Sequence, residues 1–114
     1  MNRRERRKVF ICSRYLGNAR HNVEVALALC RMAVASDLVP FAPHLLYTRF
    51  LDEDDPSQRD LGISLGLRFM EACDEVWIYI GEGISDGMRR ELEYAQRLGK
   101  PIVEIHEVEL CRRV

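Results

Sequence analysis

Four short apolar runs alternate with three longer segments of helical periodicity, and this alternation is the strongest constraint on the fold. The apolar runs cover residues 8–12, 38–42, 75–80 and 101–105, and the helical segments cover residues 22–35, 56–73 and 87–98. Nearly continuous apolar strands that are separated by helices are typical of a parallel sheet covered on both faces. Right-handed crossovers then predict an open, doubly wound α/β sheet of four or five strands in the order 2-1-3-4.

The length of 114 residues leaves room for one domain with a core, but not for two. Residues 1–7 hold a basic cluster and are expected to form a solvated leader. Residues 8–114 are expected to form the domain, a flavodoxin-like or Rossmann-like sheet. Residues 106–114 are expected to add either an edge strand or a helical turn.

Composition excludes several classes of function. The net charge of −1 argues against a protein that binds the backbone of a nucleic acid. No apolar run approaches the about 20 residues of a membrane span, and no signal peptide pattern precedes the domain, so we expect a cytoplasmic chain without a membrane partner. The four cysteines lack metal-ligand spacing and are expected to be buried, reduced thiols: Cys12, Cys30, Cys73 and Cys111. No metal and no organic cofactor is expected.

The spacing of apolar side chains predicts an inward face for two helices. In the first helix this face holds Val23, Leu27, Cys30 and Val34, widened by Ala26, Leu29 and Ala33. In the second helix it holds Leu61, Leu65, Phe69 and Ala72. The breadth of the first face, together with an apolar segment at 44–51 that is expected to form a short helix or lid, predicts a homodimer or a larger assembly.

Ligands of a doubly wound sheet bind at the carboxyl ends of the strands, where the winding reverses. Here that point lies between strands one and three, so the loops 13–18 and 81–87 are expected to face one crevice. Glu91 projects within the apolar arc of the helix 87–98, which is costly for a carboxylate unless the fold satisfies it or uses it. Either polar neighbours hold Glu91 as a structural residue, or Glu91 is a catalytic group.

The loop 81–87 carries three glycines and opens a helix. Its free N–H groups suit a phosphate, or else Ser85 or Asp86 only caps the helix. His44 is either a proton donor to a leaving base or a structural residue, and Tyr47 and Phe50 either stack on a base or pack in the fold. Residues 52–55 are expected to form a solvated acidic turn.

The chain resembles the nucleoside 2-deoxyribosyltransferase superfamily and looks like a small branch of it. The resemblance is carried by Asp74-Glu75-Val76, Ser85-Asp86-Gly87 and Glu91-Leu92-Glu93-Tyr94-Ala95. The first strand and its loop, residues 9–17, are similar to the opening strand of that superfamily. Its members transfer deoxyribosyl groups between bases or hydrolyse nucleoside monophosphates, and they share active sites across subunit interfaces.

This resemblance implies specific roles. Glu91 would attack C1′ of a nucleoside or nucleoside 5′-monophosphate, Asp86 would hold the sugar hydroxyls or orient Glu91, and Tyr15 would line the sugar. The other substrate-binding candidates are Ser13, Arg14, Gly17, His44, Gly81, Ser85, Gly87 and Met88. The expected activity is that of an N-glycosidase or deoxyribosyltransferase. The alternative is a nucleotide-sensing module that binds in the same crevice without turnover.

Overall fold

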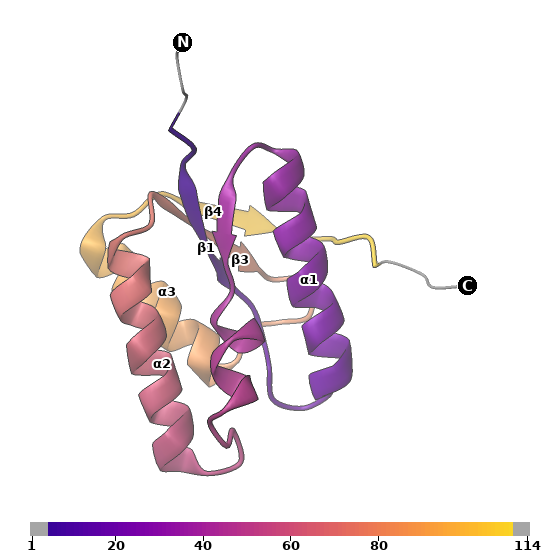
Figure 1. Cartoon of the computed structure of the whole chain (residues 1–114), viewed down its shortest axis with the longest axis vertical. Coiled ribbons are helices and arrows are strands. Elements are labelled where there is room, and N and C mark those ends of the chain that lie inside the picture. Colours follow the sequence, from indigo (N-terminus) through magenta and orange to yellow (C-terminus); the bar gives the residue numbers. More distant parts are fainter. Residues whose placement is uncertain (1–4, 111–114) are drawn as a thin grey trace.

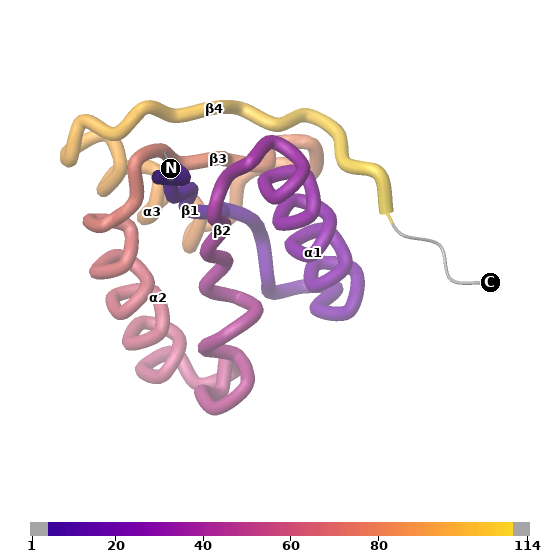
Figure 2. The backbone as a smooth tube through the Cα atoms, turned by 45° about the horizontal axis from the view of Figure 1, so that its top comes forward, coloured from indigo at the N-terminus to yellow at the C-terminus, as the bar shows by residue number. Residues whose placement is uncertain are grey.

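Strands and helices alternate along the chain in the predicted sequence. In the computed structural model, which describes residues 5–110, the elements are β1 (Lys8–Cys12), α1 (Ala19–Ala35), β2 (Val39–Phe41), the 3₁₀ helices η1 (Pro43–Leu45) and η2 (Tyr47–Arg49), α2 (Pro56–Glu71), β3 (Glu75–Tyr79), α3 (Asp86–Leu98) and β4 (Ile102–Ile105). The four strands are parallel and lie in the order β2-β1-β3-β4, which confirms the predicted topology. Helix α1 covers one face of the sheet, and α2 and α3 cover the other (Figures 1 and 2).

Both faces of the central strands are buried, which explains why their sequences are continuously apolar. On one face Phe10 and Cys12 pack with residues of α2 and α3. On the opposite face Val9 and Ile11 pack with residues of α1, together with Trp77 of β3. Because successive side chains of a strand point to opposite faces, a strand between two helical layers needs apolar residues at every position.

Each of the three α-helices begins at a polar side chain that accepts a hydrogen bond from its first turn. Asn18 accepts from the N–H of His21 at 3.2 Å, so α1 begins earlier than the predicted residue 22. Asp55 caps α2 as predicted, with Pro56 in the first turn. The Ser85 hydroxyl oxygen accepts a hydrogen bond from the N–H of Met88 at 3.2 Å. Of the two predicted caps of α3, Ser85 and Asp86, Ser85 is therefore the residue that caps the helix.

The predicted inward face of α1 is partly wrong. The helix buries Asn22, Val25, Ala26, Ala28, Leu29 and Ala33, so only the predicted Ala26, Leu29 and Ala33 lie in the core. Leu27 and Val34 are exposed, with 37% and 63% of their surface accessible. The small alanine side chains bring this side of the helix close to the sheet, whereas Leu27 and Val34 of the predicted stripe face outward.

The predicted face of α2 is also wrong. This helix buries Gly62, Ile63, Gly66 and Met70, whereas Leu61, Leu65 and Phe69 are exposed. The two glycines let the segment 43–51 lie directly against the helix. A Cβ atom on Gly66 would stand 3.3 Å from Cβ of Pro43, and one on Gly62 would stand 3.4 Å from Cδ1 of Leu51.

The predicted lid at 44–51 forms the 3₁₀ helices η1 and η2 and packs beside α2 (Figure 1). Tyr47 is buried, and its ring meets those of Phe41 and Phe50 edge to face. Phe41 in turn stacks on Phe69 of α2, with ring centroids 4.5 Å apart. Tyr47 therefore has the packing role that was one of its two predicted alternatives.

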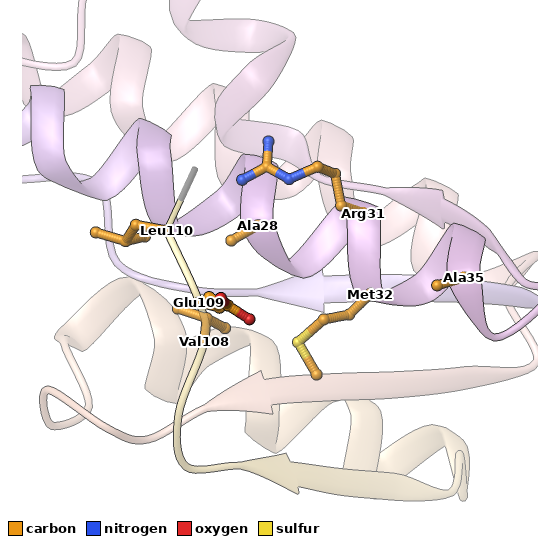
Figure 3. A pocket seen from close by; sticks show the side chains of 7 residues that line it. All are labelled: Ala28, Arg31, Met32, Ala35, Val108, Glu109 and Leu110. Carbon is orange, nitrogen blue, oxygen red and sulfur yellow. The ribbon is translucent and has the colours of Figure 1, made fainter. Parts of the chain in front are cut away.

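Residues 106–110 form neither an edge strand nor a helical turn. Val108 and Leu110 instead pack beside α1 and line a groove of about 1180 Å³ with Ala28, Arg31 and Met32 (Figure 3). The remainder of the predicted C-terminal element, residues 111–114, lies outside the described residues, as do residues 1–4 of the predicted leader.

Cys12 and Cys73 are buried, Cys30 is half-buried, and all three are free thiols. Burial raises the pKa of each of these thiols. The fourth cysteine, Cys111, lies outside the described residues. No helix in residues 5–110 is long and apolar enough to span a membrane.

Candidate functional site

The loops that follow β1 and β3 line a common cavity of about 340 Å³, as the topology predicts. Six of the predicted site residues lie around it: Arg14, Tyr15, His44, Ser85, Asp86 and Gly87. The remaining lining comes from Leu16, Glu53, Arg59, Ile63 and Ile84. The cavity is thus closed by the β1 loop, the start of α3, the first turns of α2 and the segment after β2.

Glu91 lies beneath this cavity and does not line it. Its side chain is 1% exposed and borders a second, much smaller cavity of about 10 Å³. His44, Glu53 and Ile63 line both cavities. The Oε1 atom of Glu91 is buried and has no hydrogen-bond partner within the described residues.

Burial makes Glu91 a weak acid. Loss of solvation raises the pKa of its carboxyl group to about 8, against the opposing effects of a hydrogen bond with the Cys12 thiol and the charge of Arg90. Cys12 is itself fully buried, and its thiol also lies 3.7 Å from the carbonyl oxygen of Met88. Glu91 therefore holds a proton at neutral pH in the free protein.

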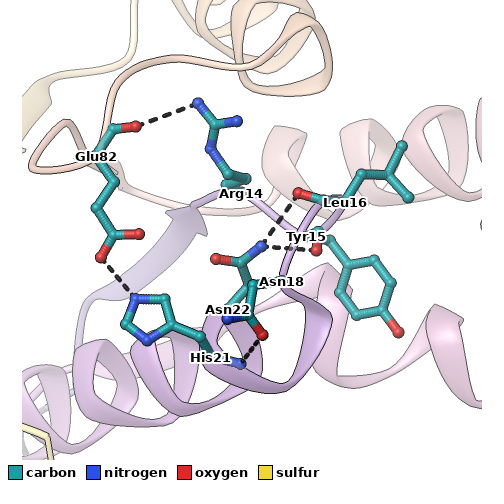
Figure 4. A network of polar contacts seen from close by, with 7 residues as sticks. All are labelled: Arg14, Tyr15, Leu16, Asn18, His21, Asn22 and Glu82. Carbon is teal, nitrogen blue, oxygen red and sulfur yellow. Dashed lines mark hydrogen bonds and ion pairs between the residues drawn. The ribbon is translucent and has the colours of Figure 1, made fainter.

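Hydrogen bonds hold the β1 loop in place from two sides (Figure 4). The buried amide of Asn22 donates to the carbonyl oxygens of Tyr15 and Leu16, at 2.7 and 3.2 Å. Arg14 donates to the carbonyl oxygen of Glu82 at 3.2 Å, and this joins the β1 loop to the β3 loop. His21 of α1 contacts the carboxylate of the same Glu82 at 2.8 Å. The two loops are therefore positioned before any ligand arrives.

The side of the cavity at the start of α3 favours an anion. The N-terminal turn of a helix presents unpaired N–H groups and the positive end of the helix dipole. Ser85, Asp86 and Gly87 of this turn line the cavity, and the cationic residues Arg14 and Arg59 also line it. The Nε atom of Arg14 is buried and has no hydrogen-bond partner among the described residues.

His44 and Tyr15 form an aromatic wall of the cavity. Their ring centroids are 5.5 Å apart and their planes are tilted by 31°. Burial lowers the pKa of His44 to about 4, although a hydrogen bond to the backbone of Ser13 opposes this shift. The imidazole is therefore neutral at pH 7.

Besides Glu91, four predicted site residues do not line the 340 Å³ cavity. Ser13 is buried, and its Oγ has no partner among the described residues. Gly17 lines a neighbouring cavity of about 400 Å³. Gly81 makes room for the ring of Tyr79 and the carbonyl of His106, and Met88 lies in the core.

Outside the two loops that were predicted to face the crevice, sequence reasoning missed three lining residues: Glu53, Arg59 and Ile63. Glu53 belongs to the acidic turn that was expected to be solvated, yet it is half-buried and burial raises its pKa. The sequence around Glu53 does not distinguish this residue from the exposed neighbours Asp52 and Asp54. Its position is set by the packing of the segment 43–51 on α2. In the described residues no group of three His, Cys, Asp or Glu side chains is placed to hold a metal ion.

Comparison with known proteins places the chain in a family. A family model described as a domain of unknown function (DUF7768) matches residues 7–105. No curated protein sequence matches the chain. The chain is similar in structure to a 2-deoxyribosyltransferase from the psychrotolerant bacterium Bacillus psychrosaccharolyticus, with a TM-score of 0.68. The two sequences are 17% identical over 85% of this chain and 70% of the other. The chain therefore belongs to the DUF7768 family and has a fold like that of 2-deoxyribosyltransferase.

Proposed function

We propose that the chain cleaves or transfers the N-glycosidic bond of a nucleoside or nucleoside 5′-monophosphate, with Glu91 as the nucleophile. The observation that carries this proposal is the buried carboxyl group of Glu91, whose Oε1 atom has no partner among the described residues, beneath the cavity at the carboxyl ends of β1 and β3. A carboxylate there can form a glycosyl-ester intermediate with C1′ of a sugar. The likeness to a protein described as a 2-deoxyribosyltransferase supports the same chemistry.

The 5′ end of the substrate is assigned to the start of α3. Backbone N–H groups near Ser85 and Gly87, together with the Arg14 guanidinium, favour a 5′-phosphate or a 5′-hydroxyl group. Asp86, at the rim of the cavity, is assigned to the sugar hydroxyls. Tyr15 lines the sugar.

Glu91 borders only the small cavity, so a sugar bound in the larger cavity must displace part of the lining that the two cavities share, which includes His44 and Ile63, to bring C1′ to Glu91. Glu91 must also give up its proton before it can attack, because a neutral carboxyl group is a poor nucleophile. Substrate binding is therefore expected to move a side chain of this wall and to ionise Glu91.

A second candidate function is a sensor that binds a nucleotide without turnover. The observation that favours it is that Glu91 does not line the 340 Å³ cavity and is protonated at neutral pH in the free protein. Both candidates use the same cavity, so binding alone does not separate them.

The proposed assembly is a homodimer or a larger oligomer in the cytoplasm, where the free thiols would stay reduced. The exposed apolar side chains of α2, which are Leu61, Leu65 and Phe69, support association. Sedimentation at micromolar concentration measures the assembly state. A monomer there would contradict this part of the proposal.

A panel of nucleosides and nucleoside 5′-monophosphates, with released base measured by chromatography, tests the proposed function. We expect base release by the wild type, no release by Glu91→Gln, and wild-type release by Glu93→Gln, an exposed position on the same helix. Turnover by Glu91→Gln near the wild-type rate would refute the role of Glu91. Ligand binding by calorimetry without base release would support the sensor.

A further inference from the structure

A buried amide at the start of α1 holds the β1 loop. Asn22 is 4% exposed, and its Nδ2 atom donates hydrogen bonds to the carbonyl oxygens of Tyr15 and Leu16 at 2.7 and 3.2 Å (Figure 4). The side-chain amide of asparagine has two N–H donors, and the loop uses both of them. A helix that packs on the sheet is thereby joined to a segment that has no regular structure of its own.

Few other contacts hold the centre of this loop. Within residues 5–110, the two bonds from Asn22 are the only hydrogen bonds that residues 15–17 form. Gly17 has a φ of 105°, so the chain turns at this glycine before Asn18 caps α1. Because ordering each residue of a loop costs conformational entropy, a loop with so few contacts depends on each of them. The amide of Asn22 is therefore the main anchor of residues 15–17.

The anchored loop carries part of the wall of the 340 Å³ cavity. Arg14, Tyr15 and Leu16 all line this cavity, and the Tyr15 ring lies 5.5 Å from the ring of His44. Because the amide of Asn22 holds the backbone of Tyr15 itself, the position of that ring depends on the amide. Asn22 does not line the cavity, so it acts on a ligand there only through the loop.

We propose that Asn22 is a positioning residue, which fixes the β1 loop in the conformation in which Arg14 and Tyr15 line the cavity, and that substrate affinity depends on this order. The inference rests on the proposed function, because it takes the ligand of this cavity to be the substrate. Without the amide the loop populates other conformations, and the apparent affinity falls in proportion to the fraction of molecules whose loop is in place. Bound substrate orders the loop again, so the chemical step at Glu91 keeps its rate.

The replacement Asn22→Leu separates the hydrogen bonds from the shape of the residue. Leucine is similar in size and favours a helix, but it cannot donate to the two carbonyl oxygens. We therefore expect α1 to stay folded while the loop loses its anchor. Asn22→Ala, which also removes both donors, serves the same purpose if the leucine variant does not fold. The matched control is Val25→Ala, which removes two methyl groups from a buried residue of the same helix and leaves the loop contacts in place.

The first test is limited proteolysis by trypsin, which needs no ligand. Trypsin cleaves after arginine only where the chain can leave its folded conformation, and Arg14 is half-buried in the loop. In Asn22→Leu we expect cleavage after Arg14, measured by mass spectrometry of the fragment that begins at Tyr15, to be about tenfold faster than in the wild type. Cleavage after Arg68 in α2 is the internal reference and should keep its rate. In Val25→Ala the ratio of the two rates should equal that of the wild type.

The second test separates KM from kcat on the nucleoside or nucleoside 5′-monophosphate from which the wild type releases base. If the loop is in place in about one molecule in ten, Asn22→Leu should raise KM about tenfold and leave kcat within about twofold of the wild type. A merely structural residue acts differently, because its loss lowers the folded fraction of the protein. Val25→Ala should therefore lower only the apparent kcat and leave KM unchanged.

The outcomes distinguish the failure of this inference from the failure of the proposed function. Absence of base release by the wild type overturns the proposed function, and the role of Asn22 in substrate affinity with it. Base release that depends on Glu91, with an unchanged KM in both Asn22 variants, overturns the assignment of Asn22 alone. Cleavage after Arg14 that accelerates no more than cleavage after Arg68 shows that the amide does not anchor the loop, and overturns the assignment in the same way.

Discussion

Replacement of Glu91 by Gln should stabilise the free protein, and the gain should grow with pH. The folded state holds a proton on Glu91 up to a pKa of about 8, whereas the unfolded chain releases it above about pH 4.5. Folding therefore takes up a proton between these two values, and the free energy of unfolding of the wild type falls as pH rises through this window. Gln has the same shape and cannot ionise in either state.

The size of the effect follows from the two pKa values. The raised pKa of Glu91 lowers the free energy of unfolding of the wild type by about 1 kcal/mol at pH 5, about 3 kcal/mol at pH 7 and about 4 kcal/mol at pH 8. The amide of Gln leaves polar atoms buried, which subtracts about 1 kcal/mol or more from the gain at every pH. The growth of the difference by about 2 kcal/mol between pH 5 and pH 7 is therefore a sharper prediction than its value at one pH.

Urea unfolding at pH 5, 6, 7 and 8, followed by the fluorescence of the buried Trp77, measures this difference. Glu93→Gln removes a carboxylate from the exposed side of the same helix and is the matched control. A constant difference between Glu91→Gln and the wild type from pH 5 to pH 8 would refute the argument. If Glu91→Gln is less stable than the wild type at pH 8, the carboxyl group of Glu91 is ionised in the folded wild type and is stabilised there by hydrogen bonds or charges.

Three further predictions concern the walls of the site. Ser85→Ala removes the cap of α3 at the N–H of Met88 and should lower the free energy of unfolding by about 1 kcal/mol, as measured by urea unfolding. His44 has a folded-state pKa of about 4, below its unfolded value of 6.5, so wild-type stability should fall as pH drops from 6.5 to 4, and His44→Gln should lose this dependence in acid titrations of unfolding. Gly81→Ala would place a Cβ atom against the carbonyl of His106 and should lower the melting temperature; an unchanged value would contradict the observed close approach.

The fold could be predicted from the sequence because its determinants are local. After their first residues, Lys8 and Glu75, β1 and β3 are apolar at every position, and this property is typical of strands that are buried on both faces. Helix ends carry equally local signals, such as Asp55 before Pro56 in α2. Right-handed connection of such elements leaves few topologies, and the observed strand order is the one expected.

The faces of the helices could not be predicted, because side-chain hydrophobicity does not report how closely a neighbour approaches. In α2 the packed positions include Gly62 and Gly66, which carry no apolar side chain, while Leu65 and Phe69 are exposed. The close packing of the segment 43–51 on this helix decides which side is buried. That segment is distant in sequence from the glycines, so the pattern within the helix does not contain the information.

Some features of the candidate site could likewise be predicted from the sequence, and others could not. The sequence by itself indicated the crevice and an inward carboxylate at Glu91, because both follow from strand order and helical periodicity. Only the tertiary structure brought Glu53 into the lining of the larger cavity and left Glu91 at a separate, smaller cavity. It also decided that Glu91 is protonated in the free protein, because its pKa depends on the loss of water around the carboxyl group. The loss of water is a property of all the elements that surround the residue, and no segment of the sequence carries it alone.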